Sequence, residues 1–522
     1  MEGKVMSDSA QRQPLGAAPP EDDYHQTLIG NVRPPDWENP QPADRYNLVV
    51  IGAGTAGLVT AAVGAALGAK VALIERHLLG GDCLNVGCVP SKAVIRASRA
   101  WAAICSASEF GIGLTDDVRY DFGIVMTRMR KLRARISHTD SAQRYKQLGV
   151  DVFIGAGRFT ATNRVEVGGQ TLNFSKAAIC TGARAVAPPI PGLERAGYLT
   201  NETIFSLTEL PRKLAVIGGG PLGCEMAQAF ARFGSQVCIF EQAGNILPRE
   251  DADATAILKA RMKKEGVCFV FESKVTRIEV RGREKVVHHE VSGDKKELVV
   301  NEILMGVGRA PNVEELGLEM AGVEYDPRSG VRVDHKLQTT NTRIFAAGDV
   351  CFPYKFTHTA DALAQIVVQN ALFPHPFGLG CASADSLIIP WCTYTYPEIA
   401  HVGLYEKDAR AKGMEVDTFT FNLDEVDRAV LDGEDEGFAR VHVRKGTDKI
   451  LGATIVAAHA GDLISQITLA MKTGAGLGTI TKTIYPYPTQ AEVIKKVANA
   501  WRKTTLTEGK KKILHRWFAW VR

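Results

Sequence analysis

Two windows of thirty residues share one order of apolar and polar positions. One window runs from Tyr46 to Glu75 and the other from Arg212 to Glu241, and they align without a gap at a constant offset of 166 residues. Each holds an apolar run, the pattern G-x-G-x-x-G, a helical stretch and a second apolar run that ends in Glu. This order predicts a buried strand, a tight turn, a helix and a second strand, twice in one chain.

The first window also contains a charge-free run, Leu48 to Ala69, that is long enough to cross a bilayer. The second window carries Glu225 and Arg232 inside the matching helix, so that copy cannot be a membrane span. Because the two copies share their pattern, we interpret residues 48–69 as a buried strand, turn and helix of a soluble domain.

The glycine pattern is typical of a dinucleotide-binding turn. The first glycine permits the tight turn, the second lets the backbone approach a pyrophosphate, and the third lets helix and strand pack closely. The pyrophosphate then lies at the positive end of the helix, and the terminal Glu accepts hydrogen bonds from ribose hydroxyls. We therefore predict two dinucleotide sites rather than two structural glycine-rich turns. Their residues are Gly52, Gly54, Gly57 and Glu75 in the first copy and Gly218, Gly220, Gly223 and Glu241 in the second.

The end of the second copy favours NADH over NADPH. Its last strand closes with Glu241 and Gln242, and no Arg occurs before Arg249. A carboxylate at this position favours a free 2′-hydroxyl and repels a 2′-phosphate. We therefore expect NADH at the second site.

Residues 80–92 read GGDCLNVGCVPSK and place Cys83 and Cys88 just beyond the first copy. Helix formers follow the pair, so Cys88 is expected near a helix start, where free N–H groups and Lys92 stabilise a thiolate. An unbroken helix would hold the two residues too far apart for a disulfide, so we expect a kink near Asn85 and Gly87. The spacing disfavours iron–sulfur and zinc sites, and two inert buried thiols remain the alternative to a redox pair.

Composition narrows the class of protein. The net charge is +4, the pI is about 8.4, and Lys and Arg are spread along the chain, so no nucleic-acid partner is expected. Ten cysteines in 522 residues, and no secretion signal, indicate an intracellular protein. The cysteines in or beside apolar segments are interpreted as structural thiols with no second close pair; they are Cys180, Cys224, Cys238 and Cys268.

These motifs, followed by TTNTRIFAAGDV at residues 339–350, resemble the flavoprotein disulfide reductases of the pyridine-nucleotide type. That family includes glutathione reductase, dihydrolipoamide dehydrogenase and mercuric reductase. The resemblance covers roughly residues 45–505. It implies an α/β fold with two Rossmann-like dinucleotide-binding domains, a C-terminal α+β dimerisation domain, FAD on the first copy and nicotinamide nucleotide on the second.

The resemblance also implies roles for single residues. Cys88 matches the sulfur next to the flavin, Cys83 the sulfur that faces substrate, and Lys92 and Glu225 an ion pair near the flavin. FAD is also expected to contact three further positions, which are Thr181, Gly182 and Asp349. Pro221 stands where some relatives carry a Tyr that gates the nicotinamide pocket.

One motif departs from the disulfide reductases. They end with His-Pro and a later Glu, and the partner subunit supplies that His as the acid–base group. Here the stretch is YPTQAE, with Tyr487 in place of His and with Glu492 kept. A phenol with a pKa near 10 is a poor proton shuttle at neutral pH. Mercuric reductases resemble this chain in having Tyr there, so we expect a mercuric-reductase-like enzyme, although their C-terminal cysteine pair is absent. A dihydrolipoamide-dehydrogenase-like enzyme and a membrane-associated NADH:acceptor flavoenzyme are the alternatives.

The expected domains follow the motifs. Residues 1–45 are a polar arm, 46–190 with a return segment at 318–385 bind FAD, 191–317 bind NAD, and 386–505 form the dimer interface of a cytoplasmic homodimer. Residues 506–522 form a basic amphipathic tail, EGKKKILHRWFAWVR, whose apolar side chains share one helical face. This tail either docks on its own dimer, the favoured interpretation, or makes a peripheral membrane contact.

Overall fold

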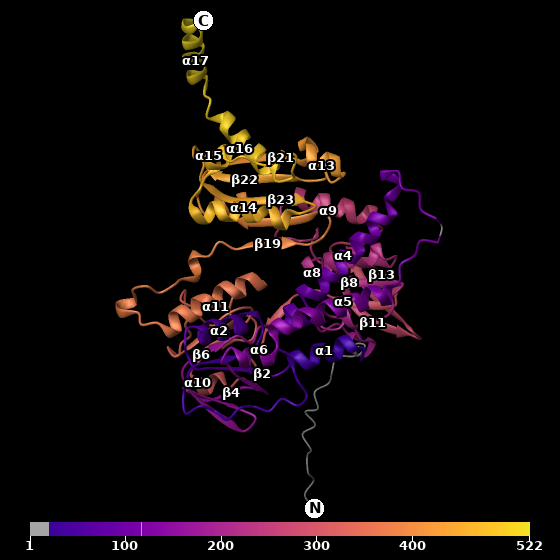
Figure 1. Ribbon diagram of the computed structural model, residues 1–522. Coiled ribbons are helices and arrows are strands. Elements are labelled where there is room, and N and C mark those ends of the chain that lie inside the picture. The colour runs from indigo at the N-terminus through magenta and orange to yellow at the C-terminus, as the bar shows by residue number, and fades with distance from the viewer. Residues whose placement is uncertain (1–19, 116) are drawn as a thin grey trace, which may run out of the picture. The chain divides into compact units, whose positions relative to one another are not determined.

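In the computed structural model, which describes residues 20–115 and 117–522, the repeated pattern forms parallel strands within two sheets (Figure 1). The first copy forms β1 (Tyr46–Ile51), α2 (Thr55–Ala66) and β2 (Val71–Glu75), and the second forms β8 (Lys213–Ile217), α8 (Pro221–Arg232) and β9 (Gln236–Phe240). In each copy the helix begins directly after the second glycine of the motif. The predicted strand, turn, helix and strand are therefore confirmed twice.

The first sheet contains seven strands in the order β3-β2-β1-β6-β5-β4, with β18 also paired to β6. Val49 of β1 lies between Ala72 of β2 and Ala177 of β6 in parallel register. The further strands are β3 (Asp151–Ile154), β4 (Arg158–Ala161), β5 (Arg164–Val167), β6 (Gln170–Ile179) and β18 (Ile344–Ala346). A strand from residues 344–346 thus returns to the sheet of the first copy, beside α11 (Thr357–Leu372), which packs on α2.

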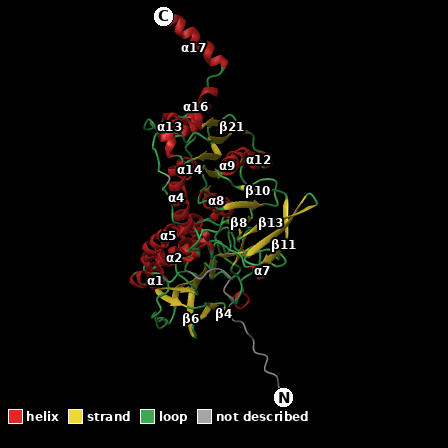
Figure 2. Ribbon diagram, turned by 90° about the vertical axis from the view of Figure 1, so that its right-hand side faces the viewer, coloured by secondary structure: helices red, strands yellow, loops and turns green. Residues whose placement is uncertain are grey.

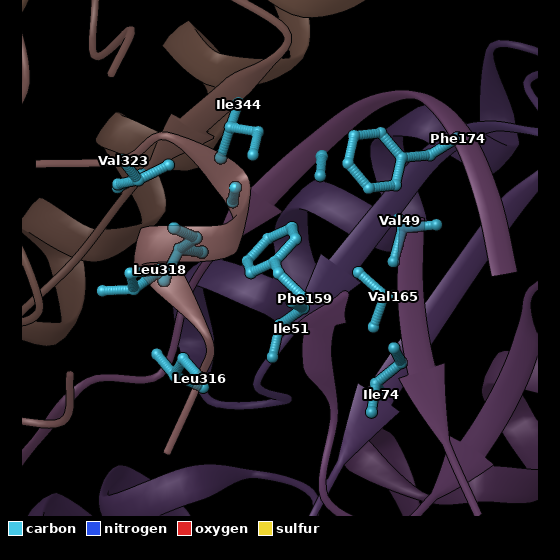
Figure 3. Packing of buried hydrophobic residues seen from close by; sticks show 14 of the residues in the cluster. Val49, Ile51, Ile74, Phe159, Val165, Phe174, Leu316, Leu318, Val323 and Ile344 are labelled. Carbon is cyan, nitrogen blue, oxygen red and sulfur yellow. The ribbon is translucent and has the colours of Figure 1, made fainter. Parts of the chain in front are cut away.

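The core of this sheet explains why its central strands, β1 and β2, are mostly apolar. Val49, Ile51 and Ile74 of the central strands meet Phe159 and Phe174 in one buried cluster (Figure 3). Both phenylalanines are fully buried, and their rings meet edge to face with centroids 6.0 Å apart. Truncating either ring to Ala would cost about 3–5 kcal/mol of folding free energy. The parallel strands are apolar on both sides because both faces are covered.

The second sheet has the order β10-β9-β8-β14, so β10 (Cys268–Val270) is an edge strand next to β9. The strand β14 (Glu302–Met305) pairs with β8 on the other side. A separate antiparallel sheet holds β11 (Ser273–Arg281), β12 (Glu284–Val291) and β13 (Asp294–Val300). The smaller pieces of this part of the chain are α3 (Gly81–Asn85), α4 (Cys88–Cys105), α5 (Phe122–Ser137), α6 (Ala142–Gln147), β7 (Ala183–Ala185), α7 (Leu193–Ala196), β15 (Arg309–Pro311), α10 (Leu318–Ala321), β16 (Tyr325–Asp326) and β17 (Gly330–Val331).

The segment before β1 is anchored to the first sheet. It contains α1 (Asp23–Val32), which packs on α5 and whose N-terminus is capped by the Asp22 carboxylate. The Trp37 indole donates a hydrogen bond to the carbonyl of Val152, 3.2 Å away. The expected polar arm at 1–45 therefore includes a helix and backbone anchors that composition did not indicate; its residues 1–19 lie outside the described part.

The described chain divides into two compact units. The first holds both copies of the repeated pattern. The second combines residues 385–522 with the segment Asn245–Gly266, which contains α9 (Ala252–Lys264). The expected NAD-binding domain at 191–317 included that segment. It belongs to the second unit because Glu250 accepts hydrogen bonds from Trp391 and Tyr405, and Asp251 pairs with Arg440.

The second unit is built on an antiparallel sheet of the order β19-β20-β23-β22-β21. Its strands are β19 (Pro390–Thr393), β20 (Glu398–Gly403), β21 (Val416–Asn422), β22 (Phe438–Arg444) and β23 (Ile450–Ala457). Its other helices are α12 (Glu406–Ala411), α13 (Asp427–Asp432), α14 (Ala460–Thr473), α15 (Leu477–Lys482), α16 (Glu492–Thr504) and α17 (Glu508–Val521). Two of them, α14 and α16, pack on the sheet and fill one buried apolar cluster with it. The fold is therefore mixed α/β, as the resemblance implied.

The last helix, α17, stands apart from the rest of its unit (Figures 1 and 2). Every residue from Glu508 to Arg522 is exposed, including Trp517 and Trp520, whose rings lie 5.3 Å apart. Among the described residues, no helix has the length and apolar character needed to cross a bilayer.

Candidate active site

The first glycine turn needs glycine for steric reasons. A Cβ on Gly57 would lie 1.8 Å from the carbonyl oxygen of Gly52, and a Cβ on Gly52 itself would lie 2.4 Å from the carbonyl oxygen of Cys180. Gly52 also has φ +100°, a value that L side chains rarely adopt. The face of Gly54 is open, since a Cβ there would meet only the Cα of Gly81, at 3.8 Å. The turn thus leaves bare backbone for a close ligand.

The second turn repeats this geometry. A Cβ on Gly223 would lie 2.1 Å from the carbonyl oxygen of Gly218, and one on Gly218 would lie 2.5 Å from the carbonyl oxygen of Gly306. A Cβ on Gly220 would meet nothing closer than 3.9 Å. The two turns are therefore equivalent in structure as well as in sequence.

In each copy, the Glu that ends the second apolar run is hydrogen-bonded to the backbone of the glycine turn. Glu75 accepts hydrogen bonds from the backbone N–H of Ala53 at 2.6 Å and of His77 at 2.7 Å. Glu241 accepts from Gly219 at 2.6 Å and from Ala243 at 2.9 Å, the positions that match by the repeat. A carboxylate oxygen has a second lone pair, so each Glu can still accept from a ribose hydroxyl. Burial raises the pKa of Glu75, and the two N–H donors oppose that effect.

A cavity of about 310 Å³ adjoins the first turn. Glu75 and Gly52 line it on one side, and Thr181, Asn312 and Glu314 line it on the other. Asn312 holds this wall together, because its side-chain amide donates to the carbonyl of Thr181 while its backbone N–H donates to that of Gly182. Thr181 and Gly182 thus lie beside the first glycine motif.

The cysteine pair lies where the helix breaks. The short helix α3 ends at Asn85, Val86 and Gly87 leave helical geometry, and α4 begins at Cys88. A Cβ on Gly87 would lie 2.8 Å from the carbonyl oxygen of Asp82, so glycine is required at the break. The expected kink and the helix start at Cys88 are both confirmed.

Both sulfurs are thiols in this structure, and they are close enough to share a hydrogen bond. That bond from Cys83 lowers the pKa of Cys88 to about 6, from an ordinary value of 9.0. Burial acts in the opposite direction, and the Thr357 hydroxyl, 3.3 Å from the Cys88 sulfur, and the charge of Lys92 add to the lowering. The pKa of Cys83 is raised, first by its bond to Cys88 and then by burial. At neutral pH the geometry therefore favours one thiolate, on Cys88.

A half-buried ion pair lies beside this thiolate. The Lys92 ammonium, one turn along α4 from Cys88, lies 2.8 Å from the carboxylate of Glu225 in α8. The Glu225 side chain is 6% exposed and that of Lys92 is 37% exposed. The charge of Lys92 lowers the pKa of Cys88 and that of Glu225 raises it, so the pair acts on the sulfur with opposite signs. The structure brings together the two residues that the resemblance paired.

Comparison with known proteins decides the family. The family model described as pyridine nucleotide-disulphide oxidoreductase matches residues 46–365, and the dimerisation domain of that family matches residues 389–498. The chain belongs to the pyridine nucleotide-disulphide oxidoreductases. This family consists of FAD-dependent enzymes that use pyridine nucleotides. The residues above fit both nucleotides, because each glycine turn offers bare backbone and a tethered carboxylate.

Relatives within the family differ in activity. A mercuric reductase from Bacillus cereus is 35% identical over 86% of this chain and 70% of its own length. A dihydrolipoyl dehydrogenase from Geobacillus stearothermophilus is 34% identical over 86% of this chain and 95% of its own. The HOCl-induced flavoprotein disulfide reductase RclA from Escherichia coli superposes with a TM-score of 0.77 at 28% identity, over 87% of this chain and 99% of its own. RclA has also been solved as a Cu(II) complex.

Asp349 lies in a charged cluster with Arg309 and Asp82, of which only Asp349 was expected from the sequence. Arg309 places its Nε 3.5 Å from the Asp349 carboxylate and also contacts the carboxylate of Asp82 in α3. Burial raises the pKa of Asp349, and the charge of Arg309 opposes that rise. Arg309 was missed. Its segment GVGRAPN carries no signal except that it follows an apolar strand.

Tyr487 and Glu492 lie in the second unit. The Tyr487 hydroxyl donates a hydrogen bond of 2.8 Å to the carboxylate of Asp427, and the ring is 71% exposed. Asp427 first, and Glu492 to a smaller degree, raise the pKa of Tyr487. Glu492 begins α16, and its buried Oε2 has no hydrogen-bond partner among the described residues. Asp427 was not anticipated from sequence.

The positions of the other cysteines contradict one prediction, namely that the chain has no second close pair of cysteines. Cys180 and Cys224 are buried, as expected. Cys238 and Cys268, however, are direct neighbours in the parallel register of β9 and β10, and the pKa of Cys238 is raised by burial and further by the Cys268 side chain close by. Thirty residues separate them in sequence, which is why inspection of spacing found no second close pair. Among the described residues, no group of three or more His, Cys, Asp and Glu side chains is arranged to hold a metal ion.

Proposed function

We propose that this protein is an NAD(P)H-dependent flavoenzyme that passes electrons through a redox-active Cys83–Cys88 pair to a metal ion or a thiol or disulfide acceptor. The carrying observation is the contact between the two sulfurs at the break between α3 and α4. The ion pair of Lys92 and Glu225 beside Cys88 supports it. FAD would be held by the first glycine turn, Glu75, Thr181, Gly182 and Asp349, and when bound it supplies two-electron transfer between nicotinamide and sulfur.

The pair itself would cycle between a disulfide and a dithiol. The disulfide takes up two electrons and one proton, its S–S bond breaks, and a Cys83 thiol and a Cys88 thiolate result. The lowered pKa of Cys88 and the raised pKa of Cys83 set which sulfur keeps the proton. Lys92 and the helix N-terminus at Cys88 stabilise the negative sulfur. Cys83 is then the sulfur that meets the acceptor.

Tyr487 favours a mercuric-reductase-like acceptor over dihydrolipoamide. A soft metal ion is bound by thiolates and needs no imidazole to move a proton during exchange. The hydrogen bond to Asp427 raises the pKa of Tyr487, so this phenol is a still weaker acid than free tyrosine. A dihydrolipoamide-dehydrogenase-like activity is the alternative, given the relatives of similar identity.

The second glycine turn and the dimerisation domain support two further parts of this proposal, the nicotinamide site and the homodimer. Gly218, Gly220, Gly223 and Glu241 would hold the nicotinamide nucleotide, and the carboxylate of Glu241 favours NADH. The matched dimerisation domain supports a homodimer, in which each subunit would add its Tyr487 and Glu492 to the other's sulfurs. A cytoplasmic enzyme fits the cysteine usage.

Besides docking on its own dimer, the tail has a second candidate role, which is peripheral contact with a membrane. The apolar face of α17 carries Ile513, Trp517 and Phe518, and a run of three lysines, Lys510 to Lys512, lies beside it. Exposed aromatic side chains next to basic ones match the interfacial region of an anionic bilayer. Such a contact would bring the enzyme to a membrane-bound acceptor.

One anaerobic titration tests the dithiol function. One equivalent of NADH per FAD, which supplies the two electrons that the disulfide takes up, should produce the long-wavelength band of a thiolate in contact with oxidised flavin. Cys88→Ser should abolish the band and acceptor turnover. Cys105→Ser, which changes an exposed cysteine at the other end of α4, should keep both. If turnover survives Cys88→Ser, the dithiol mechanism is wrong, and rates with Hg(II), lipoamide and quinones then identify the acceptor.

A further inference from the structure

The edge of the second sheet carries a pair of sulfurs that the proposed mechanism does not use. Cys238 lies in β9 and Cys268 in the edge strand β10, in direct parallel register. Adjacent strands run about 4.8 Å apart, and disulfides join Cα atoms about 4.4–6.8 Å apart. Residues paired in this way point to the same face of the sheet, and the two side chains are close enough to hydrogen-bond. The backbone therefore already has the separation that a bridge needs.

The two sulfurs differ in access. Cys238 is 6% exposed and belongs to the apolar cluster with Phe240 and Val287, whereas Cys268 is exposed. Burial raises the pKa of Cys238, and Cys268 adds to that rise. An oxidant from solution therefore reaches Cys268 first, and Cys238 is the sulfur that reacts second.

We propose that Cys238 and Cys268 form a second redox-sensitive dithiol, which closes to a disulfide on exposure to hydroperoxides and reopens with small dithiols. The Cys268 thiol loses its proton, and the thiolate attacks a peroxide oxygen. The O–O bond breaks to give a sulfenic acid and hydroxide, and the released proton converts the hydroxide to one water. The Cys238 sulfur then attacks the Cys268 sulfur, the S–O bond breaks, and a second water leaves. Overall, two thiols and one hydrogen peroxide give one disulfide and two waters.

A disulfide between Cys238 and Cys268 would lie close in sequence to Glu241, which holds the second glycine turn. Three residues after Cys238, the backbone N–H of Glu241 donates to the carbonyl of Val270, two residues after Cys268. Glu241 in turn holds the glycine turn of the nicotinamide site. A bridge would fasten β10 to β9 three residues before Glu241, and it would close a loop of about thirty residues, which restricts the unfolded chain. The oxidised sheet should therefore be more resistant to unfolding.

Peptide mapping tests this proposal independently of the enzyme's activity. The holoenzyme is treated with hydrogen peroxide in the presence of a metal chelator, its remaining thiols are alkylated, and it is digested with trypsin without reduction. The expected product joins the peptides 233–249 and 265–274, which contain Cys238 and Cys268. Any bridge between Cys83 and Cys88 lies in other peptides, so failure of the proposed function does not affect the result.

Two variants and a control sharpen the test. Cys268→Ser should lose the cross-linked product and leave Cys238 alkylatable. Cys238→Ser should trap Cys268 as a sulfenic acid that dimedone labels. Cys105→Ser should form the product as the parent does and should show the same rise of several degrees in thermal midpoint on oxidation. The proposal is overturned if the parent protein accumulates oxidised Cys268 while Cys238 remains a free thiol.

Discussion

The Lys92 ammonium lies 2.8 Å from the carboxylate of Glu225, although 133 residues separate the two in sequence. Lys92 follows the cysteine pair in α4, and Glu225 lies inside the helix of the second repeat. The ion pair therefore connects α4, which begins at Cys88, to the helix of the second repeat. Its two charges act on that sulfur with opposite signs.

Removing either charge should move the pKa of Cys88 in a defined direction. Lys92→Gln removes a positive charge and should raise that pKa from about 6 toward about 7. Glu225→Gln removes a negative charge and should lower it. The rate of iodoacetamide alkylation of the reduced enzyme, measured from about pH 4 to pH 9, reports the thiolate fraction. Shifts of the same sign in both variants would contradict the assignment.

The same lowered pKa makes the stability of the reduced protein depend on pH. A group whose pKa is lower in the folded state stabilises that state at high pH. The thiolate of Cys88 should thus contribute fully above pH 9.0, and the contribution should be lost as the pH falls through about 6. Urea unfolding of the reduced protein at several pH values, compared with Cys88→Ser, checks this. An equal pH dependence in both proteins would exclude it.

Glu241 should set the choice of nicotinamide nucleotide. We expect kcat/KM for NADH to exceed that for NADPH, and Glu241→Gln to reduce this ratio by about tenfold, since the amide no longer repels a 2′-phosphate. The amide oxygen can still accept from Gly219, so the turn should remain folded. Gln242→Ala, one residue further on, is the matched control and should keep the ratio. A parent enzyme that prefers NADPH would refute the assignment.

Tyr487→His should increase the activity of the enzyme with disulfide substrates. An imidazole can exchange a proton near neutral pH, and positioned acid–base groups contribute about 10²–10⁴-fold to rate, so kcat with lipoamide or glutathione disulfide should rise at least about tenfold. Tyr487→Phe removes the hydroxyl that donates to Asp427 and should leave these low rates unchanged. Steady-state kinetics of the three proteins decide the matter. A large loss in Tyr487→Phe would show that the phenol itself transfers the proton.

The tail should bind anionic membranes. The full chain should sediment with vesicles that contain phosphatidylserine, and much less with neutral vesicles, because α17 places lysines beside its exposed aromatic side chains. Trp517→Ser with Trp520→Ser, and charge reversal at Lys510 to Lys512, should each weaken this binding. Both sets change exposed residues, so folding should persist. If deletion of 507–522 changes the oligomeric state and not vesicle binding, the helix docks on the dimer.

Local pattern was enough for the parts of the site that lie within a few residues of one another. The glycine turns, their terminal Glu residues and the break between Asn85 and Cys88 follow from steric rules that act over one turn or one strand. The family likeness then paired Lys92 with Glu225 and pointed to Tyr487. These features repeat or stand in compact motifs, so a single sequence was sufficient to find them.

Only the tertiary structure decided which distant residues meet. Sequence spacing could not place Arg309 against Asp82 and Asp349, or Asp427 under the Tyr487 hydroxyl, because those contacts depend on how strands and helices pack. The same limit hid the pairing of Cys238 with Cys268, which parallel strand register sets. It also hid the attachment of residues 245–266 to the second unit through Glu250 and Arg440. Sequence order records local backbone preference, and contact between distant side chains is fixed only when buried surfaces assemble.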